Sequence, residues 1–348
     1  MDTTSLPFLQ TKGWLTLGRG PTDVTRVRVC AAHDEWNHVG ITLAAMAEGF
    51  LALEGLAEVE LVTVPESSGE LLDREAMQVE MLATGAADIG VDPRTTFVLE
   101  AKSAGRPVCI VAARRKNHAF VVFGRKGLAS IEDLRGMTID MGTEGGATDV
   151  MLRQVCIDTG LQPGRDVHVE YLGGAMHDSA GTIGEFRAGR RPVILVSYPD
   201  EIANLIGEGY PVLADLRTRY PSRHDRVTAA NSDFAARHPD LLEAFLRGMI
   251  RACNFVIDLN NGPRFKEIML GAGFLTSERE QANFDGLLQG WQERVSRDLA
   301  LPRDGIELIV DEEQRAGKLP ASFAVDDVLS LDALVRAQAT LGLEPIGV

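Results

Sequence analysis

Short apolar runs alternate with stretches that carry apolar residues at helical spacing in the first hundred residues. The apolar runs predict strands at 27–31, 59–64 and 87–91, and the helical spacing predicts helices at 39–53, 74–84 and 95–104. Polar or glycine-rich turns separate the two kinds of segment. This β-α order predicts a parallel sheet with helices covering it.

The rest of the chain continues the pattern and then becomes helical. Further apolar runs predict strands at 108–113, 119–123, 137–141, 167–171, 193–196, 211–213 and 228–231. Apolar residues at helical spacing predict helices at 239–258, 263–272, 276–295, 304–316 and 325–340. We expect an α/β protein of two lobes, each a mostly parallel sheet with flanking helices, joined by a hinge. The expected divisions are an N-terminal arm (1–24), lobe 1 (25–112 and 226–348) and lobe 2 (113–225).

A glycine-rich turn lies between a predicted strand and a predicted helix in lobe 2. The sequence MGTEGGAT covers residues 141–148. A strand, a glycine turn and a helix in this order can present free backbone N–H groups and the positive end of a helix dipole to an anion. Thr143 and Thr148 can add hydroxyl donors. The alternative is an ordinary strand-to-helix turn, and neither GxGxxG nor GxxxxGK[ST] is present.

Composition narrows the classes of function. The net charge of −15 argues against a nucleic-acid surface as the main role, because phosphate binding needs a basic face. No apolar run is long enough to span a bilayer. The first twenty residues lack the features of a signal peptide, which predicts a cytoplasmic location. The sequence predicts no cofactor.

The cysteines are expected to be reduced core residues. Cys30, Cys109, Cys156 and Cys253 are widely separated, and no pair has the spacing of metal ligands. We therefore predict no metal site.

Several pieces of the chain, in order, resemble the family that binds nitrate, sulfonates, taurine and thiamine pyrimidine precursors, which has the type 2 periplasmic binding protein fold. They are WNHVG at 36–40 with AEGF at 47–50 and EGL at 54–56, GAADIG at 85–90, IEDLRGMTI at 131–139, GLQP at 160–163 followed by DV at 166–167, and GKLP at 317–320. The resemblance covers about residues 25–345. It implies a small-molecule ligand in the cleft between the lobes. The general rule for open parallel sheets also places ligands at the carboxyl ends of strands.

The candidate ligand-binding residues therefore follow the predicted strands. They are Trp36, Asn37, His38, Ser67, Ser68, Gly69, Asp92, Thr143, Gly145, Gly146, Thr148, Ser197 and Tyr198.

Several candidates have a structural alternative. Trp36 can stack on a planar ligand or pack on the hinge. His38 can donate a hydrogen bond or a proton, or cap the helix that follows it. Asp92 can face a ligand or cap the helix that begins at Thr95.

A basic run follows the strand at 108–113. Strand alternation sends adjacent side chains to opposite faces, so at most one of Arg114 and Arg115 is expected to face a ligand. The run comprises Arg114, Arg115 and Lys116, and a solvated surface position is its favoured interpretation.

Two functions remain open from the sequence. The first is a substrate-binding protein for an anionic or planar organic molecule, with the permease of an ABC importer as its partner if the protein is exported. The alternative is a cytoplasmic decarboxylase-, desulfinase- or hydrolase-like enzyme on the same scaffold, with His38 as its acid–base group. Desulfinases of this type carry a catalytic cysteine after the first strand, whereas Cys30 lies inside that strand and is expected in the core. Nothing in the sequence indicates the oligomeric state.

Overall fold

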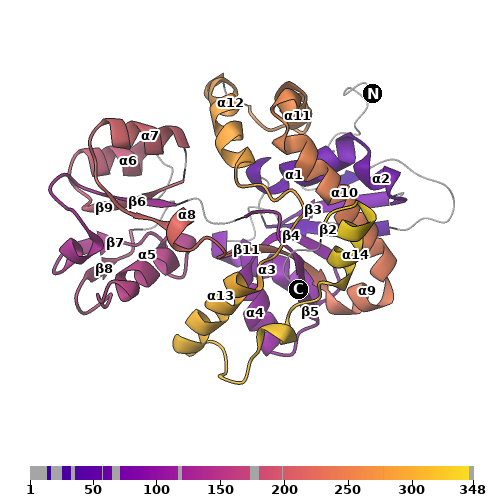
Figure 1. The fold of residues 1–348 in the computed structure, drawn as a ribbon, viewed down its shortest axis with the longest axis horizontal. Coiled ribbons are helices and arrows are strands. Elements are labelled where there is room, and N and C mark those ends of the chain that lie inside the picture. Colours follow the sequence, from indigo (N-terminus) through magenta and orange to yellow (C-terminus); the bar gives the residue numbers. More distant parts are fainter. Residues whose placement is uncertain are drawn as a thin grey trace. The chain divides into compact units, whose positions relative to one another are not determined.

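The computed structural model describes residues 14–16, 26–32, 36–56, 58–64, 71–116, 120–172, 180–197, 199–276 and 278–344 (Figure 1). The chain divides into two compact units. Unit 1 is Met1–Lys116 with Ser222–Val348, and unit 2 is Asn117–Pro221. Among the described residues, no helix combines the length and the apolar character needed to cross a membrane.

Unit 1 is built on a six-stranded sheet of order β1-β3-β2-β4-β11-β5. Its strands are β1 (Trp14–Thr16), β2 (Arg26–Ala31), β3 (Glu58–Thr63), β4 (Ile89–Arg94), β5 (Val108–Ala112) and β11 (Arg226–Asn231). Strand β2 pairs in parallel with β3 and β4, while β11 is antiparallel to both β4 and β5. Strand β1, which pairs antiparallel with β3, lies inside the segment expected as an irregular arm.

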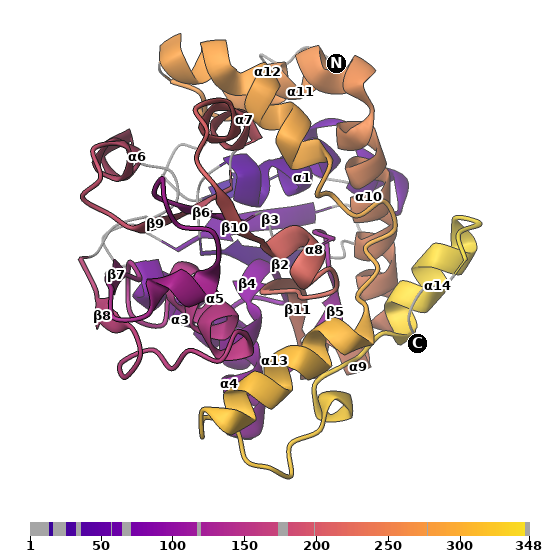
Figure 2. The same ribbon diagram turned by 60° about the vertical axis from the view of Figure 1, so that its left-hand side comes forward.

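Helices cover both faces of this sheet (Figure 2). One face packs against α1 (Trp36–Ala47), α10 (Pro239–Ile257), α11 (Gly262–Gly271), α12 (Glu278–Gln292) and α14 (Asp332–Thr340). The other packs against α3 (Leu71–Ala83), α4 (Thr95–Ser103) and α13 (Arg303–Arg315). Strand alternation explains the division, because Val29 faces the first cluster and its neighbour Cys30 faces the second.

The remaining described helical segments of unit 1 are short. They are α2 (Phe50–Leu53), α9 (Ser232–Arg237), η4 (Leu259–Asn261) and η5 (Val325–Asp327). The helix expected over 39–53 is divided into α1 and α2, because Gly49 adopts a φ of 73°, which ends a right-handed helix. The helix expected over 325–340 is likewise divided, into η5 and α14.

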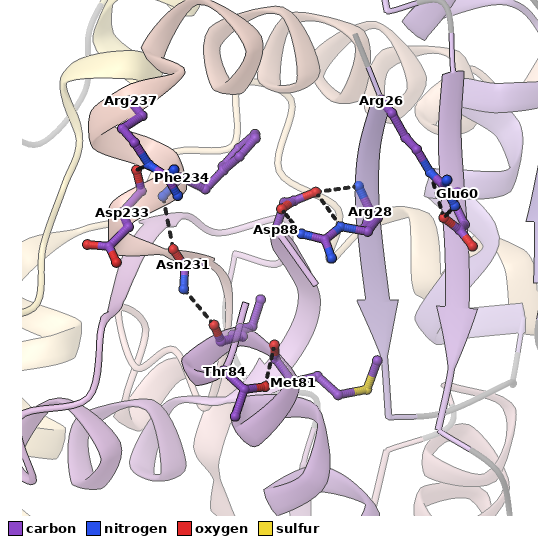
Figure 3. Close-up of polar contacts among 11 residues, drawn as sticks. Arg26, Arg28, Glu60, Met81, Thr84, Asp88, Asn231, Asp233, Phe234 and Arg237 are labelled. Atoms are coloured by element: carbon purple, nitrogen blue, oxygen red, sulfur yellow. Dashed lines mark hydrogen bonds and ion pairs between the residues drawn. The ribbon is translucent and has the colours of Figure 1, made fainter. Parts of the chain in front are cut away.

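Two ion pairs at the amino-terminal edge of the unit 1 sheet are those of Arg28 with Asp88 and of Arg26 with Glu60 (Figure 3). Asp88 accepts hydrogen bonds from the backbone N–H of Arg28 at 2.8 Å and from its guanidinium at 2.7 and 3.1 Å. This pair ties β2 to the start of β4. Nearby, the Asn231 side chain caps α9 by accepting from the Phe234 N–H at 2.9 Å.

Unit 2 contains two smaller sheets. In its described part, the sheet of order β10-β6-β9 consists of β6 (Val121–Gly124), β9 (Val193–Val196) and β10 (Val212–Asp215), and β7 (Thr138–Asp140) pairs with β8 (His168–Glu170). The helices are η3 (Ile131–Leu134), α5 (Ala147–Asp158), α6 (Ala180–Arg187), α7 (Pro199–Gly207) and α8 (Leu216–Arg219).

The α/β class is confirmed, but the sheets are mixed. In unit 2, β6 is antiparallel to both β9 and β10, and β7 pairs with β8 in parallel. The expected predominance of parallel pairing does not hold there. A strand buried on both faces is a continuous apolar run whichever way its neighbours point, so the sequence pattern does not reveal strand direction.

Candidate functional site

A buried polar cluster lies at the carboxyl end of β4 in unit 1, and Asp92 is its centre. The residue is 2% exposed and has a φ of 65°, in the left-handed region that few residues other than glycine adopt. A shift in the pairing register of β11 with β4, between Arg226 and Thr228, lies opposite this position. Such irregularities re-aim side chains. Strained backbone of this kind clusters at functional sites.

Three side chains converge on one oxygen of Asp92. Its Oδ2 atom lies 2.5 Å from Nη2 of Arg114, 2.6 Å from Nη2 of Arg115 and 2.7 Å from Nδ1 of His38. His38 lies in the first turn of α1, where it is 8% exposed. Arg114 also donates to the backbone carbonyl of Asn37 at 3.1 Å. The end of β4, the end of β5 and the start of α1 therefore meet at one carboxylate.

The surface position expected for the basic run is wrong for its two arginines. Arg114 is 2% exposed, and both guanidiniums reach Asp92. Strand alternation does not apply to them, because β5 ends at Ala112. The chain there is instead held by residues 294–296: the backbone N–H of Ser296 donates to the Arg114 carbonyl, and that of Lys116 donates to the Arg294 carbonyl, both at 2.8 Å.

A second carboxylate extends the cluster. Glu75 of α3 is fully buried and accepts from Nε of Arg94 at 2.7 Å and from the guanidinium of Arg226. Arg226 also donates to the backbone carbonyl of Asp92 at 3.0 Å. Four guanidiniums thus share two carboxylates, in contrast to the single pair of Arg28 and Asp88 at the opposite edge.

The guanidiniums outnumber the carboxylates, and this imbalance shifts the pKa values of the cluster. Burial disfavours the Asp92 carboxylate, but Arg114, Arg115 and His38 outweigh burial and hold its pKa well below the usual range. Burial lowers the pKa of Arg115 to about 9; Asp92 opposes the decrease, while Arg114, Arg226 and Arg294 add to it. The Arg115 charge is therefore incompletely compensated.

Several buried polar atoms in the cluster have no hydrogen-bond partner among the described residues. They include Nε of Arg114, Nε of Arg115, Oδ1 of Asp92 and Oδ1 of Asn37. The Arg115 side chain is 21% exposed, against 2% for Arg114. A cation that is undercompensated and partly accessible is suited to binding an oxyanion, since guanidinium donors match its geometry and charge.

The structure brings together Asn37, His38 and Asp92 from the sequence-predicted set. Asp92 does not cap α4, whose N-cap residue is Arg94 without a side-chain hydrogen bond. Trp36 lies next to them in sequence but packs edge-on against other aromatic rings. Its ring centroid is 5.2 Å from those of Phe284 and Trp291 and 6.4 Å from that of Phe265. Trp36 therefore contributes to packing between α1, α11 and α12.

The glycine-rich turn of unit 2 uses most of its own donors. The N–H of Gly145 donates to Asp149 at 2.9 Å, and that of Gly146 donates to the Thr143 carbonyl at 2.8 Å. The Thr148 hydroxyl donates to the Met141 carbonyl at 3.0 Å. The Thr143 hydroxyl makes no hydrogen bond within the described part of the chain, and it is the donor of this turn that stays a candidate for ligand binding.

The other predicted residues are less informative. Ser67, Ser68, Gly69 and Tyr198 lie outside the described residues. Ser197 follows β9 and is half-buried.

The cysteine prediction is confirmed. Cys30 is fully buried, and burial raises its pKa to about 12, which leaves it protonated and unreactive at neutral pH. The other three cysteines are also buried and free. Among the described residues, no group of three or more histidine, cysteine and acidic side chains is placed to hold a metal ion.

The sequence reasoning missed Glu75, Arg94 and Arg226, and it misplaced Arg114 and Arg115. Two arginines directly after a wholly apolar strand were an available signal, because that position in an α/β sheet lies at the ligand-binding edge.

Comparisons with known proteins agree with this fold. A periplasmic sulfonate-binding protein SsuA from Methylobacillus flagellatus, described as part of a putative sulfonate ABC transporter, has a TM-score of 0.66 at 17% identity, covering 94% of this chain and 97% of that one. The periplasmic nitrate-binding protein NrtA from Synechocystis has a TM-score of 0.61 at 15% identity, covering 92% and 89%. At these identities the likeness shows the periplasmic binding protein fold alone.

Comparisons of the sequence identify a relative and a matching family model. The bicarbonate transport ATP-binding protein CmpC of Synechocystis is 23% identical over 252 residues, which are 68% of this chain but only 36% of that protein. The family model described as NMT1/THI5 like matches residues 35–259, well over half of the chain. This chain, with its two units and its buried arginine cluster, belongs to the NMT1/THI5-like family.

Proposed function

We propose that this protein binds a small anionic organic molecule and acts as a substrate-binding protein. The observation that carries the proposal is the sharing of one buried carboxylate, Asp92, by Arg114 and Arg115. Unbalanced charge in a buried position is costly, and an anionic ligand would compensate it.

The similar proteins support an anion as ligand. Their names refer to sulfonate, nitrate and bicarbonate. A role in the import of such an anion would give this chain the permease of an ABC transporter as its partner. The carboxyl edge of the unit 1 sheet is also where ligands bind in open α/β sheets. The cytoplasmic location stays a prediction.

The first experiment is a thermal-shift screen with acetate, benzoate, methanesulfonate, taurine and nitrate, followed by calorimetry on each anion that stabilises the protein. Loss of a charge-assisted hydrogen bond costs about 1.5–3 kcal/mol. We therefore expect Arg115→Gln to weaken binding roughly 10- to 150-fold. The variant should fold, because Asp92 then keeps Arg114 and His38 as partners.

Arg28→Gln is the matched control. Arg28 is also an arginine of unit 1 that pairs with a buried aspartate, but at the opposite edge of the sheet. Its replacement should lower stability without changing anion affinity. If no anion stabilises the wild-type protein, or if Arg115→Gln binds as well as wild type, the proposed function is wrong.

A second candidate function is an enzyme on the same site. The 2.7 Å contact between Asp92 and Nδ1 of His38 favours it, since a carboxylate beside a ring nitrogen orients an imidazole for acid–base chemistry. Mass spectrometry of each bound anion after incubation distinguishes the two functions. Recovery of a smaller product, lost in His38→Gln, would establish turnover. Recovery of unchanged ligand would support a binding protein.

A further inference from the structure

Glu75 of α3 is a fully buried carboxylate that holds two arginines on neighbouring strands. Its Oε2 atom accepts from Nε of Arg94 at 2.7 Å, and its Oε1 atom pairs with the guanidinium of Arg226. These two arginines are cross-strand partners in the antiparallel pairing of β4 with β11. Like charges at directly opposed positions repel each other, so the carboxylate that both of them contact stabilises this pair.

The same two arginines border a β-bulge in β4. Asp92 and Pro93 together lie opposite the single residue Val227 of β11, which is a two-against-one pairing. Bulges re-aim side chains and occur often next to functional sites. Within this bulge, the guanidinium of Arg226 donates to the Asp92 carbonyl at 3.0 Å. Glu75 is therefore connected to Asp92 through one guanidinium.

The bulge decides where the Asp92 carboxylate lies. Asp92 has a φ of 65°, and in this conformation its Oδ2 atom lies 2.5 Å from Nη2 of Arg114 and 2.6 Å from Nη2 of Arg115. A left-handed residue other than glycine is held in place by its surroundings rather than by its own preference. Contacts that fix the bulge therefore also fix the carboxylate that Arg115 contacts.

We infer that Glu75 is a positioning residue of the anion site. The inference rests on the proposed function and adds to it a residue that acts through Arg226 and Asp92 on Arg115. A guanidinium already held in one orientation loses less conformational freedom when an anion binds, and that difference appears as affinity. Without Glu75, repulsion between Arg94 and Arg226 loosens the bulge, and Arg115 loses its fixed partner.

Glu75→Gln tests the inference, because charge and position predict opposite results. Loss of a negative charge near the site would by itself strengthen anion binding. Loss of positioning should weaken it, and we expect the affinity to fall about 3- to 10-fold for the tightest binder among acetate, benzoate, methanesulfonate, taurine and nitrate. Calorimetry at neutral pH measures the change. Unchanged or tighter binding would overturn the inference.

A double-mutant cycle with Arg115→Gln shows whether Glu75 acts through Arg115. If it does, Glu75→Gln should weaken binding less than about twofold once Arg115 is already replaced, because no oriented guanidinium remains to be lost. Losses that simply multiply in the double variant would assign the effect to a general change of structure, and the positioning role would be wrong.

Glu54→Gln is the matched control. The Glu54 side chain is 9% exposed and also holds two arginines, with its oxygens 2.5 Å from Nε of Arg247 and 2.6 Å from Nε of Arg251. Both arginines belong to α10, which covers the opposite face of the sheet from α3. This variant should lose stability and keep the anion affinity of the wild type. An equal loss of affinity would assign the effect to net charge or stability and overturn the inference.

Should Glu75→Gln fail to fold, Glu75→Asp takes its place. This variant keeps the negative charge but is shorter by one methylene group, so its oxygens cannot reach both Arg94 and Arg226 as before, and it should show the same decrease in affinity. If none of the five compounds binds the wild type, the proposed function fails and the inference with it. If they bind and the Glu75 variants bind as tightly as the wild type, anion binding stands and the positioning role is overturned.

Discussion

At the scale of single residues, Asp92 combines a strained backbone with several partners. A left-handed conformation costs an ordinary residue about 1–2 kcal/mol, and aspartate and asparagine tolerate it better than most. Pro93 disfavours the right-handed helical alternative for the residue before it. The contacts with Arg114, Arg115 and His38 offset this strain and hold the carboxylate in place. Among the described residues, it is the only carboxylate in contact with either arginine.

The lowered pKa of Arg115 predicts how anion binding changes with pH. Burial favours its neutral form and lowers its pKa to about 9 in the folded protein. A bound anion requires the charged form. Affinity should therefore be constant from about pH 7 to pH 8.5 and should fall about tenfold per pH unit well above pH 9. Calorimetry across this range, with circular dichroism to confirm the fold, measures the change.

The same shift has the opposite sign for stability. The charged form of Arg115 is disfavoured by folding, so its cost to the ligand-free protein is full below pH 9 and is relieved as the pH rises above 9 towards the ordinary pKa of an arginine. Deprotonation of Arg115 above pH 9 therefore should not unfold the protein, so unfolding should not be the cause of a loss of anion affinity there. An affinity that stays constant to pH 10.5 would contradict a role for charged Arg115.

At the scale of elements, α13 and the loop before it contact the two segments where the chain leaves and re-enters unit 1. The N–H of Ala113 donates to the Leu299 carbonyl at 3.0 Å on the outgoing segment. On the returning segment, α13 lies against Ser222 so closely that a Cβ atom on Gly305 would be 1.6 Å from its carbonyl oxygen. Only glycine fits at this helix position.

Gly305→Ala tests this contact. The added methyl group must displace α13 or the chain at Ser222, and we expect a loss of about 1–3 kcal/mol in the free energy of unfolding. Gly286→Ala in α12 is the control, because a Cβ atom there meets nothing within 4 Å. That change should leave stability unchanged or raise it by up to about 1 kcal/mol. Equal thermal unfolding of both variants would show that α13 adapts without cost.

The glycine-rich turn of unit 2 gives a separate prediction. The N–H groups of Gly145 and Gly146 donate within the turn, whereas the Thr143 hydroxyl is a donor with capacity left. Thr143→Val keeps the side-chain shape and should weaken binding of an anion by about 1–2 kcal/mol. Calorimetry with the best anion from the screen measures the difference. An unchanged affinity would make this an ordinary strand-to-helix turn.

The elements themselves could largely be predicted from the sequence, and their pairing could not. The strand expected at 193–196 is β9 with the same bounds, and the strand expected at 228–231 is the end of β11. Alternation and apolar runs report burial, which is local information. They do not report that β11 lies between β4 and β5 or that β6 is antiparallel to its neighbours.

At the scale of the whole molecule, the net charge of the chain and the charge of the candidate site have opposite signs. The chain has 50 acidic and 35 basic residues, and the net charge of −15 repels anions at long range. In the proposed function, the arginines beside Asp92 attract anions locally, where most of the charged groups are buried. The arginines and carboxylates around Asp92 come from α3, β4, the chain after β5, and β11, between residues 75 and 226, so no short segment of the sequence contains them together. Asn37, His38 and Asp92 could be predicted from strand ends and a family resemblance. The grouping of the arginines could not, because it depends on the order of the strands in the sheet.

The position of β11 also has a consequence for how the chain assembles. Strand β5 pairs with β11, but β11 is synthesised only after the whole of unit 2 has emerged. Until then β5 has no neighbouring strand in the described sheet, and its open edge is exposed to pairing with other chains. Unit 2 is a continuous segment and can fold first, whereas unit 1 must wait for a partner more than a hundred residues away. We therefore expect the last step of folding, and the one most prone to aggregation, to be the insertion of β11 between β4 and β5.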